Sequence, residues 1–247
     1  MRVGLIVQSL AASLTPLNGR ELADGLGLSK SSVHRLLQGL AGSGLVRRVH
    51  DGWVLALPGH DAELEASLHQ NVEPMALAAR DLLHDLTSET RETTTLSTRV
   101  GLRRVYVQQV PGPQVIHIKV DMLRTYALHA GASSKAILAF LPPTLVRAVL
   151  STALPRITEH TVTDPGSLTV DIAEIRRRGG AVTTGERWDG VTSIACPVFV
   201  ASDHVVGAVS VGAPAHRVGT PELQETIFQK VAATAAAITA RLEGSAA

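Results

Sequence analysis

The sequence has little of several features that would point to particular protein classes. It contains one cysteine, Cys196, so it can form no internal disulfide and no zinc site built from several cysteines, which is typical of a reducing compartment. Only 3% of the residues are aromatic, so the chain offers little of the stacking surface that binders of single-stranded nucleic acid use. No uninterrupted apolar segment approaches the roughly 18 residues of a membrane span. The longest, near residues 194–201, is typical of a strand.

The first residues, Met1 to Ser13, only faintly resemble a signal peptide. Their apolar run from Val3 to Val7 is short, and Gln8 interrupts it, so we interpret the segment as a helix. We therefore expect a soluble, cytoplasmic protein with no membrane partner.

What the sequence does have is enough apolar material for a large core and an uneven distribution of charge. The 247 residues are 45% apolar, which suits one large domain or two unequal ones. The net charge is +1, but residues 1–60 carry six basic and three acidic side chains, a balance of +3, which leaves −2 for the remainder. The split favours a polyanionic partner for the N-terminal part, although charge alone is also compatible with chance scatter.

The first sixty residues predict a winged helix-turn-helix. Apolar residues from Val3 to Leu14 recur at helical spacing, and a second, short helix begins after Asn18 as N-cap and ends at Gly27. Ser29 can cap a third helix, and an alternating pattern on both sides of a turn at Asp51-Gly52 predicts a hairpin, which would be the wing. Short helix, glycine turn and longer helix in this order are typical of a DNA-docking module.

The third helix has an apolar face, which includes Val33 and Leu37, and a polar face of hydroxyls, an amide and a cation that fits a major groove about 12 Å wide. A polar helix face can also be merely solvated, and paired arginines often serve solubility. Our candidates for base contacts are Ser31, Ser32, His34 and Arg35. Our candidates for phosphate contacts are Arg20, Lys30, Arg47, Arg48 and His50. Ser29 and Gln38 complete the predicted DNA-binding surface.

Beyond Pro58-Gly59 the sequence predicts a linker helix and then a mixed α and β region. We expect a winged helix-turn-helix over 1–58, a linker helix over 59–70 and a larger domain over 71–247, which gives an α+β fold. In the larger domain a helix containing Met75 to Leu86 comes first. Strands are expected at 93–97, 105–110, 115–120, 192–200 and 205–211, and helices at 133–141, 144–150, 168–178 and from 220 onward. The arginines 176–178 suit the C-terminal end of a helix dipole better than a second nucleic-acid site.

Three segments carry a resemblance to the IclR family of bacterial transcription regulators. They are Leu28–Leu37 with Gly44-Leu45-Val46, then Leu128–Ala139, and then Gly190–Phe199 running on to Val205–Gly212. The resemblance covers almost the whole chain. It implies a winged helix, a linker helix and a GAF-like effector domain, assembled as a homodimer or a dimer of dimers, with a small-molecule effector as partner.

The resemblance also implies where the effector would bind. The expected lining is Ala132, Ser133, Thr183, Val191, Ser193, Ser210 and Gly212. Several relatives have an acidic residue where Thr183 falls, a cysteine at Ser193 and a serine at Gly212, so the resemblance names no particular metabolite. Backbone N–H groups at the start of the 133–141 helix could receive a carboxylate, which suggests a small organic acid. The hydroxyls could equally satisfy themselves on nearby carbonyls inside a sheet.

Two other functions compete with a ligand-controlled regulator that represses or activates. An enzyme would need a nucleophile and a base, but the residues around Ser133-Ser134-Lys135, His129, His117 and Cys196 form no recognised catalytic motif. The ten histidines are scattered without metal-ligand spacing, so we expect no metal and no cofactor. An architectural DNA-binding protein whose larger domain only oligomerises is the second alternative; a ligand-dependent change in operator affinity would separate it from a regulator.

Overall fold

The computed structural model describes residues 2–12, 16–42, 46–49, 52–55, 62–122, 124–201 and 203–244. The chain forms two compact units, residues 1–61 and residues 62–247, and each is described by itself. The predicted domain boundary after residue 58 lies outside the described residues and stays a prediction. No helix in the described ranges is long and apolar enough to cross a membrane.

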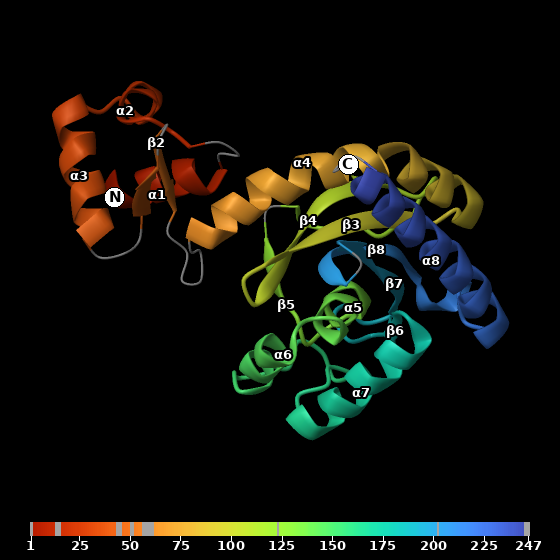
Figure 1. The fold of residues 1–247 in the computed structure, drawn as a ribbon. Helices are drawn as coiled ribbons and strands as arrows, with labels where there is room; N and C mark the ends of the chain where they lie inside the picture. Colours follow the sequence, from red (N-terminus) through yellow and green to blue (C-terminus); the bar gives the residue numbers. More distant parts are fainter. Residues whose placement is uncertain are drawn as a thin grey trace. The chain divides into compact units, whose positions relative to one another are not determined.

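The first unit contains three helices and a hairpin (Figure 1). They are α1 (Arg2–Ala12), α2 (Gly19–Leu26), α3 (Lys30–Gly42), β1 (Val46–Val49) and β2 (Gly52–Leu55). The side chain of Asn18 accepts from the N–H groups of Arg20 and Glu21, both at 2.9 Å, and Glu21 accepts from the Asn18 N–H at 2.8 Å. This capping box fixes the start of α2, and Gly27 ends it at a φ of 62°, a left-handed conformation that favours glycine.

The hairpin packs on the helices through Trp53, which is buried. Leu17 and Trp53 exchange two backbone hydrogen bonds, which adds a short third strand segment to the hairpin. Gly52 pairs with Val49 and is the first residue of β2 rather than a turn residue, one position away from our expectation. The core of this unit consists of Ile6, Leu10, Leu22, Ala23, Val33, Leu37, Leu40, Val46 and Trp53.

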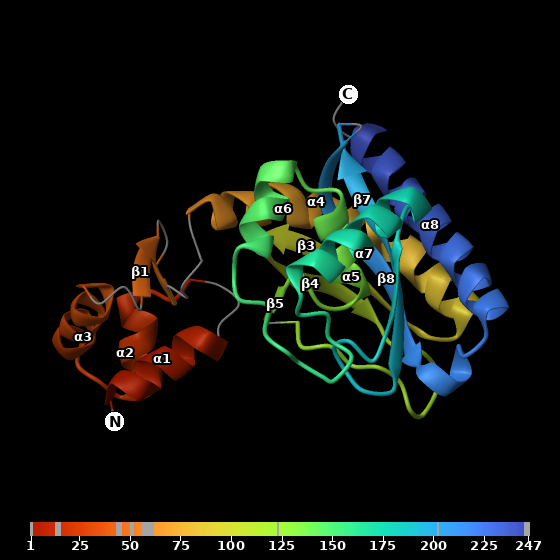
Figure 2. The same cartoon turned by 90° about the horizontal axis from the view of Figure 1, so that it is seen from below.

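The second unit is a curled six-stranded antiparallel sheet with helices on both faces (Figures 1 and 2). Its strands are β3 (Thr93–Val100), β4 (Arg103–Val110), β5 (Thr125–Ala127), β6 (Ala181–Thr184), β7 (Val191–Val200) and β8 (His204–Pro214), in the order β5-β4-β3-β8-β7-β6. One face is covered by α4 (Ala62–Thr90) and α8 (Pro221–Gly244). The other face is covered by α5 (Ala132–Ala139), which packs on α7 (Pro165–Arg178); α6 (Pro143–Leu150) and a short 3₁₀ turn (Ala215–Arg217) complete the unit.

The structure differs from our expectation at the linker. We expected one helix to end at residue 70 and another to follow, but α4 is a single helix that contains Pro74. A proline in a helix interior removes one backbone hydrogen bond, which made a break plausible. Met75, Ala79 and Leu83 are nevertheless fully buried against the sheet and on α8, and this packing favours a continuous helix.

The predicted strand at 115–120 is wrong. Val115 is fully exposed and Ile116 is 72% exposed, and the segment has no strand assignment. Strand β5 pairs with Arg103–Val105 of β4, and beyond it the Ile118 carbonyl oxygen accepts from the side chains of Thr93 and Gln109 instead of joining a strand ladder. The short strands β5 and β6 were not in our expectation.

Candidate functional site

The polar face of α3 lies exposed, as a DNA-reading helix requires. Ser31, His34, Arg35 and Gln38 are exposed and Ser32 is half-buried, whereas Val33, Leu37 and Leu40 on the opposite face are buried in the unit's core. Ser29 accepts from the Ser32 N–H at 3.3 Å and donates its hydroxyl proton to Ser32 Oγ at 2.8 Å. The Ser29 hydroxyl therefore caps the helix, and its capping role orients the first turn.

The predicted phosphate contacts are only partly described. Arg20, Lys30 and Arg48 are exposed, and Arg20 lies 3.7 Å from Asp24 in a surface ion pair that leaves both side chains mostly in solvent. Arg47 lies in β1, but its side chain is not described, and His50 lies outside the described residues. Three exposed cations and a polar helix face thus belong to the same unit.

A narrow pocket in the second unit brings together five of the seven predicted effector residues: Ala132, Ser133, Thr183, Val191 and Ser193. It lies between the start of α5, strands β4, β6 and β7, and the segment that joins β6 to β7. Thr183 and Ser193 face each other across the β6–β7 pairing.

The other two predicted effector residues, Ser210 and Gly212, do not line this pocket. The Ser210 hydroxyl forms a 2.7 Å hydrogen bond with the hydroxyl of Thr95, its partner across β3 and β8. Gly212 lies opposite Thr93 on the same strands, and a side chain there would meet Ile118. The Ser210 hydroxyl thus finds its hydrogen-bond partner inside the sheet, which was the alternative to a ligand contact.

Six further residues line the pocket, and we did not predict them. They are Arg104, Tyr106, Gly131, Glu186, Arg187 and Trp188. Arg104 is 1% exposed, and its guanidinium donates to Ser134 Oγ at 2.7 Å, Ser97 Oγ at 3.2 Å and the Tyr106 hydroxyl at 3.0 Å. Arg104 is thus a fully buried cation held by neutral groups.

Arg187 lies beside the Tyr126 ring, with its guanidinium carbon 3.9 Å from the ring centre. Its Nε is buried and has no hydrogen-bond partner. Burial, followed by the nearby charge of Arg104, lowers the pKa of Arg187 to about 10. Burial is also the main cause that raises the pKa of Tyr126.

A buried ion cluster closes the other side of the pocket. Lys135, with a side chain 2% exposed, lies 2.5 Å from Glu186 and 2.6 Å from Asp171. Glu186 also accepts from the Gly131 N–H at 3.0 Å, at the start of α5. The Gly131 N–H, just before the helix start that we expected to receive a ligand carboxylate, therefore already binds a carboxylate of the protein.

The residues considered for catalysis have other partners. The Ser134 hydroxyl accepts from Arg104, and Lys135 is held by its two carboxylates, so neither activates the other. Burial lowers the pKa of His129, whose Nε2 lies 3.0 Å from the Pro155 carbonyl oxygen. Burial raises the pKa of Cys196 to about 12, which keeps the thiol protonated. Among the described residues, no group of three or more His, Cys, Asp or Glu side chains is arranged to hold a metal.

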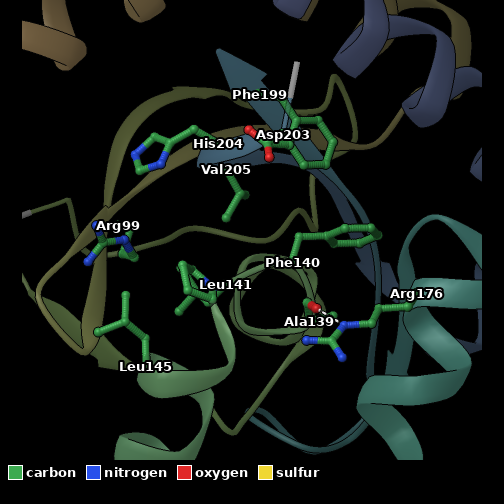
Figure 3. Close-up of a pocket in the computed structure, with 11 residues that line it drawn as sticks. Arg99, Ala139, Phe140, Leu141, Leu145, Arg176, Phe199, Asp203, His204 and Val205 are labelled. Atoms are coloured by element: carbon green, nitrogen blue, oxygen red, sulfur yellow. Dashed lines mark hydrogen bonds between the residues drawn. The ribbon is translucent and has the colours of Figure 1, made fainter. Parts of the chain in front are cut away.

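A larger hollow, about 660 Å³ and open to solvent, lies at the other end of α5 (Figure 3). Arg99 and Arg176 lie on opposite sides of it, and the rings of Phe140 and Phe199 contact each other edge to face at 5.4 Å. Arg176 donates to the carbonyl oxygen of Ala139, the last residue of α5, so its guanidinium caps the C-terminal end of that helix. None of the predicted effector residues lines this hollow.

Comparison with known families accounts for both units. Residues 1–50 match the IclR helix-turn-helix domain, and residues 69–240 match the model described as bacterial transcriptional regulator IclR C-terminal. The chain belongs to the IclR family of transcription regulators. A winged helix-turn-helix and a GAF-like mixed α/β domain are thereby confirmed as its architecture.

Individual IclR relatives are similar to this chain along most of their length. The HTH-type transcriptional regulator BhcR of Paracoccus denitrificans is 31% identical over 222 residues, which cover 89% of this chain and 78% of that protein. A putative IclR regulator from Silicibacter sp. TM1040 is 29% identical, with a TM-score of 0.66 over 98% of this chain and 96% of that one. An IclR homologue from Microbacterium hydrocarbonoxydans, solved in complex with 4-hydroxybenzoate, has a TM-score of 0.67 at 22% identity, over 98% and 97% of the two chains.

Members of this family are DNA-binding transcription regulators, so DNA binding through the first unit follows from the family assignment. BhcR is a transcriptional regulator by name, like the other curated relatives of this family.

Proposed function

We propose that this IclR-family chain recognises a double-stranded operator through the exposed face of α3 and that a small organic acid, bound in the pocket of the second unit, changes its affinity for that operator. The protein would act in the cytoplasm, as a repressor or an activator according to where the operator lies in the promoter. The observation that carries the proposal is the division of α3 into a buried face and an exposed face of hydroxyls, imidazole, guanidinium and amide.

In this proposal Ser31, Ser32, His34 and Arg35 contact base edges, while Arg20, Lys30 and Arg48 contact phosphates. Arg35 is exposed in the second turn of α3, where a guanidinium can form paired hydrogen bonds with a guanine. Phosphate contacts hold the helix in register but carry no sequence information. Arg35 therefore decides between sequence-specific binding and general attraction to DNA.

The test begins with selection of bound fragments from random DNA, followed by gel-shift titration on the selected site. Arg35→Ala is expected to cost about 1–3 kcal/mol of operator affinity and to relax the base preference at one position. Arg80→Ala, which removes an exposed arginine from α4 in the second unit, is the control and should bind as wild type does. Unchanged binding by Arg35→Ala would reject the assigned role of α3.

The effector part of the proposal is supported by the pocket and by a relative. Thr183 and Ser193 line the pocket from two paired strands, and Ala132 and Ser133 line it from the start of α5. The Microbacterium homologue of the same fold was solved with 4-hydroxybenzoate, which is an organic acid. Repeating the titration on the selected operator with and without candidate acids tests the effector role, because a purely architectural protein would show no response to any of them.

A further inference from the structure

The pocket in the second unit is lined by two cations that no acidic residue in the described part of the chain compensates. Arg104 is 1% exposed, and every partner of its guanidinium is a neutral hydroxyl. Arg187 forms no ion pair with any residue that the structure describes, and its Nε is buried without a partner. The two charges are close enough for Arg104 to disfavour the protonated form of Arg187.

The carboxylate nearest in sequence to Arg187 is committed elsewhere. Glu186 binds Lys135 at 2.5 Å and the Gly131 N–H at 3.0 Å, and Lys135 is further neutralised by Asp171. The ion cluster therefore balances its own charge and leaves the positive charge of Arg104 and Arg187 facing the pocket. A buried cation without an anion is costly to the fold, and that cost is offset when an anion binds beside it.

The walls beside these cations are aromatic in a chain that has few aromatic residues. Both tyrosines of the sequence, Tyr106 and Tyr126, and one of its two tryptophans, Trp188, gather here. The two tyrosine rings contact each other edge to face at 5.1 Å, and Arg187 lies 5.2 Å from the Trp188 ring. The space between these flat side chains is narrow, which favours a small flat ligand over a bulky or branched one.

We propose that Arg187, with Arg104 behind it, binds the carboxylate of a small planar monocarboxylic acid whose flat body packs on the aromatic walls of this pocket. The inference rests on the proposed effector role and names the anchor and the chemical class of the effector. It adds a cationic anchor beside the start of α5, where Glu186 already occupies the Gly131 N–H. A guanidinium offers paired donors that match both oxygens of a carboxylate.

The experiment measures binding to the full chain by calorimetry and by the shift of the unfolding midpoint. The probes are 2-furoate, benzoate and 4-hydroxybenzoate, each compared with its neutral amide, and sodium chloride matches the ionic strength. At least one carboxylate is expected to bind wild type and to raise its midpoint more than its amide does. Arg187→Met should weaken that binding by about ten- to hundredfold, which is the usual size of a charge-assisted contact.

The matched control is Arg177→Met. Arg177 is an exposed arginine on α7 that pairs with Glu174, and its loss should leave probe binding unchanged. Since Met removes an uncompensated charge, ligand-free Arg187→Met should unfold at a midpoint no lower than that of wild type. Arg187→Lys serves as a second variant if Met disturbs the fold; it keeps the charge without the planar fork and should bind the probe several-fold more weakly than wild type.

The inference is overturned if no carboxylate binds better than its amide, or if the Arg187 variants bind as tightly as wild type. Its failure is separable from that of the proposed function. Arg187-dependent binding without any change in operator affinity would support the anchor and refute effector control. An acid that changes operator affinity equally in wild type and Arg187→Met would support effector control and refute the anchor.

Discussion

Lys135 holds together the elements beside the pocket of the second unit. Its ammonium group is almost completely buried and joins α5 to Asp171 on α7 and to Glu186 in the segment before β7. Breaking a buried ion pair by removing one partner leaves the other charge unpaired, which is costlier than the pair itself is stabilising. Lys135 therefore supports the pocket without lining it.

Lys135→Met is expected to lower the free energy of unfolding by about 3–5 kcal/mol, because Glu186 would lose its main partner while buried. Urea unfolding at neutral pH measures the change. Lys230→Met is the control: Lys230 pairs with Glu89 at 2.6 Å, but both side chains are partly exposed, and surface pairs contribute at most about 1 kcal/mol. Equal losses in the two variants would contradict the role assigned to Lys135.

The small residues of the pocket could be predicted from sequence, but its charged residues could not. Thr183 and Ser193 follow from the order of the family's motifs, because strand register brings matched positions together. Arg104 lies in a strand where arginine normally points to solvent, and only tertiary packing on α5 buries it. The one available signal for Arg187 was the Arg-Trp pair at 187–188 in a chain with few aromatics.

At the scale of helices and strands, α4 and α8 are held together by a paired hydrogen bond as well as by their apolar faces. The guanidinium of Arg241 on α8 donates to both carboxylate oxygens of Asp81 on α4, at 2.6 and 2.8 Å. The hydrogen bonds from Arg241 lower the pKa of Asp81 from 3.8 to about 2. Both side chains are exposed, so the contribution to stability is small but has a defined pH dependence.

Because the folded state lowers the pKa of Asp81, its stabilising effect is complete above pH 4 and disappears as the pH falls through about 2. We expect the unfolding midpoint of Asp81→Asn to lie below that of wild type at pH 7 and the two midpoints to converge near pH 2. Glu73→Gln, on the same helix, is the control and should show no such convergence. A difference between wild type and Asp81→Asn that stays constant down to pH 2 would assign the effect to something other than this ion pair.

Elements with strong local signals were predictable, and those that depend on a neighbour were not. Asn18 and Gly27 delimit α2 by their own chemistry, so its limits could be read directly from sequence. The segment at 115–120 has β-branched residues, but Val115 and Ile116 are exposed and the Ile118 carbonyl oxygen binds the side chains of Thr93 and Gln109 rather than a strand. In α4, the sequence pattern suggested two helices, but packing on the sheet favours a single one.

At the scale of the whole molecule, we expect two copies of the chain to bind one operator. If two chains place their α3 helices in successive major grooves, the half-sites lie roughly 34 Å apart, or a multiple of it, and read as an inverted repeat. Footprinting of the selected operator, with the mass of the complex measured in solution, checks this prediction. A single unrepeated site occupied by one chain would contradict a dimeric or dimer-of-dimers arrangement.

Cys196 makes the chain a convenient host for spectroscopic labels. Cys196 is 2% exposed, and burial raises the pKa of its thiol to about 12, so maleimide reagents should not react with it in the folded protein. A cysteine introduced at an exposed position of α3 outside the predicted DNA contacts, such as Gly39, would then be the only reactive site, without a cysteine-free background having to be engineered first. Pairs of fluorophores attached in this way could follow, molecule by molecule, the separation of the two α3 helices in a complex.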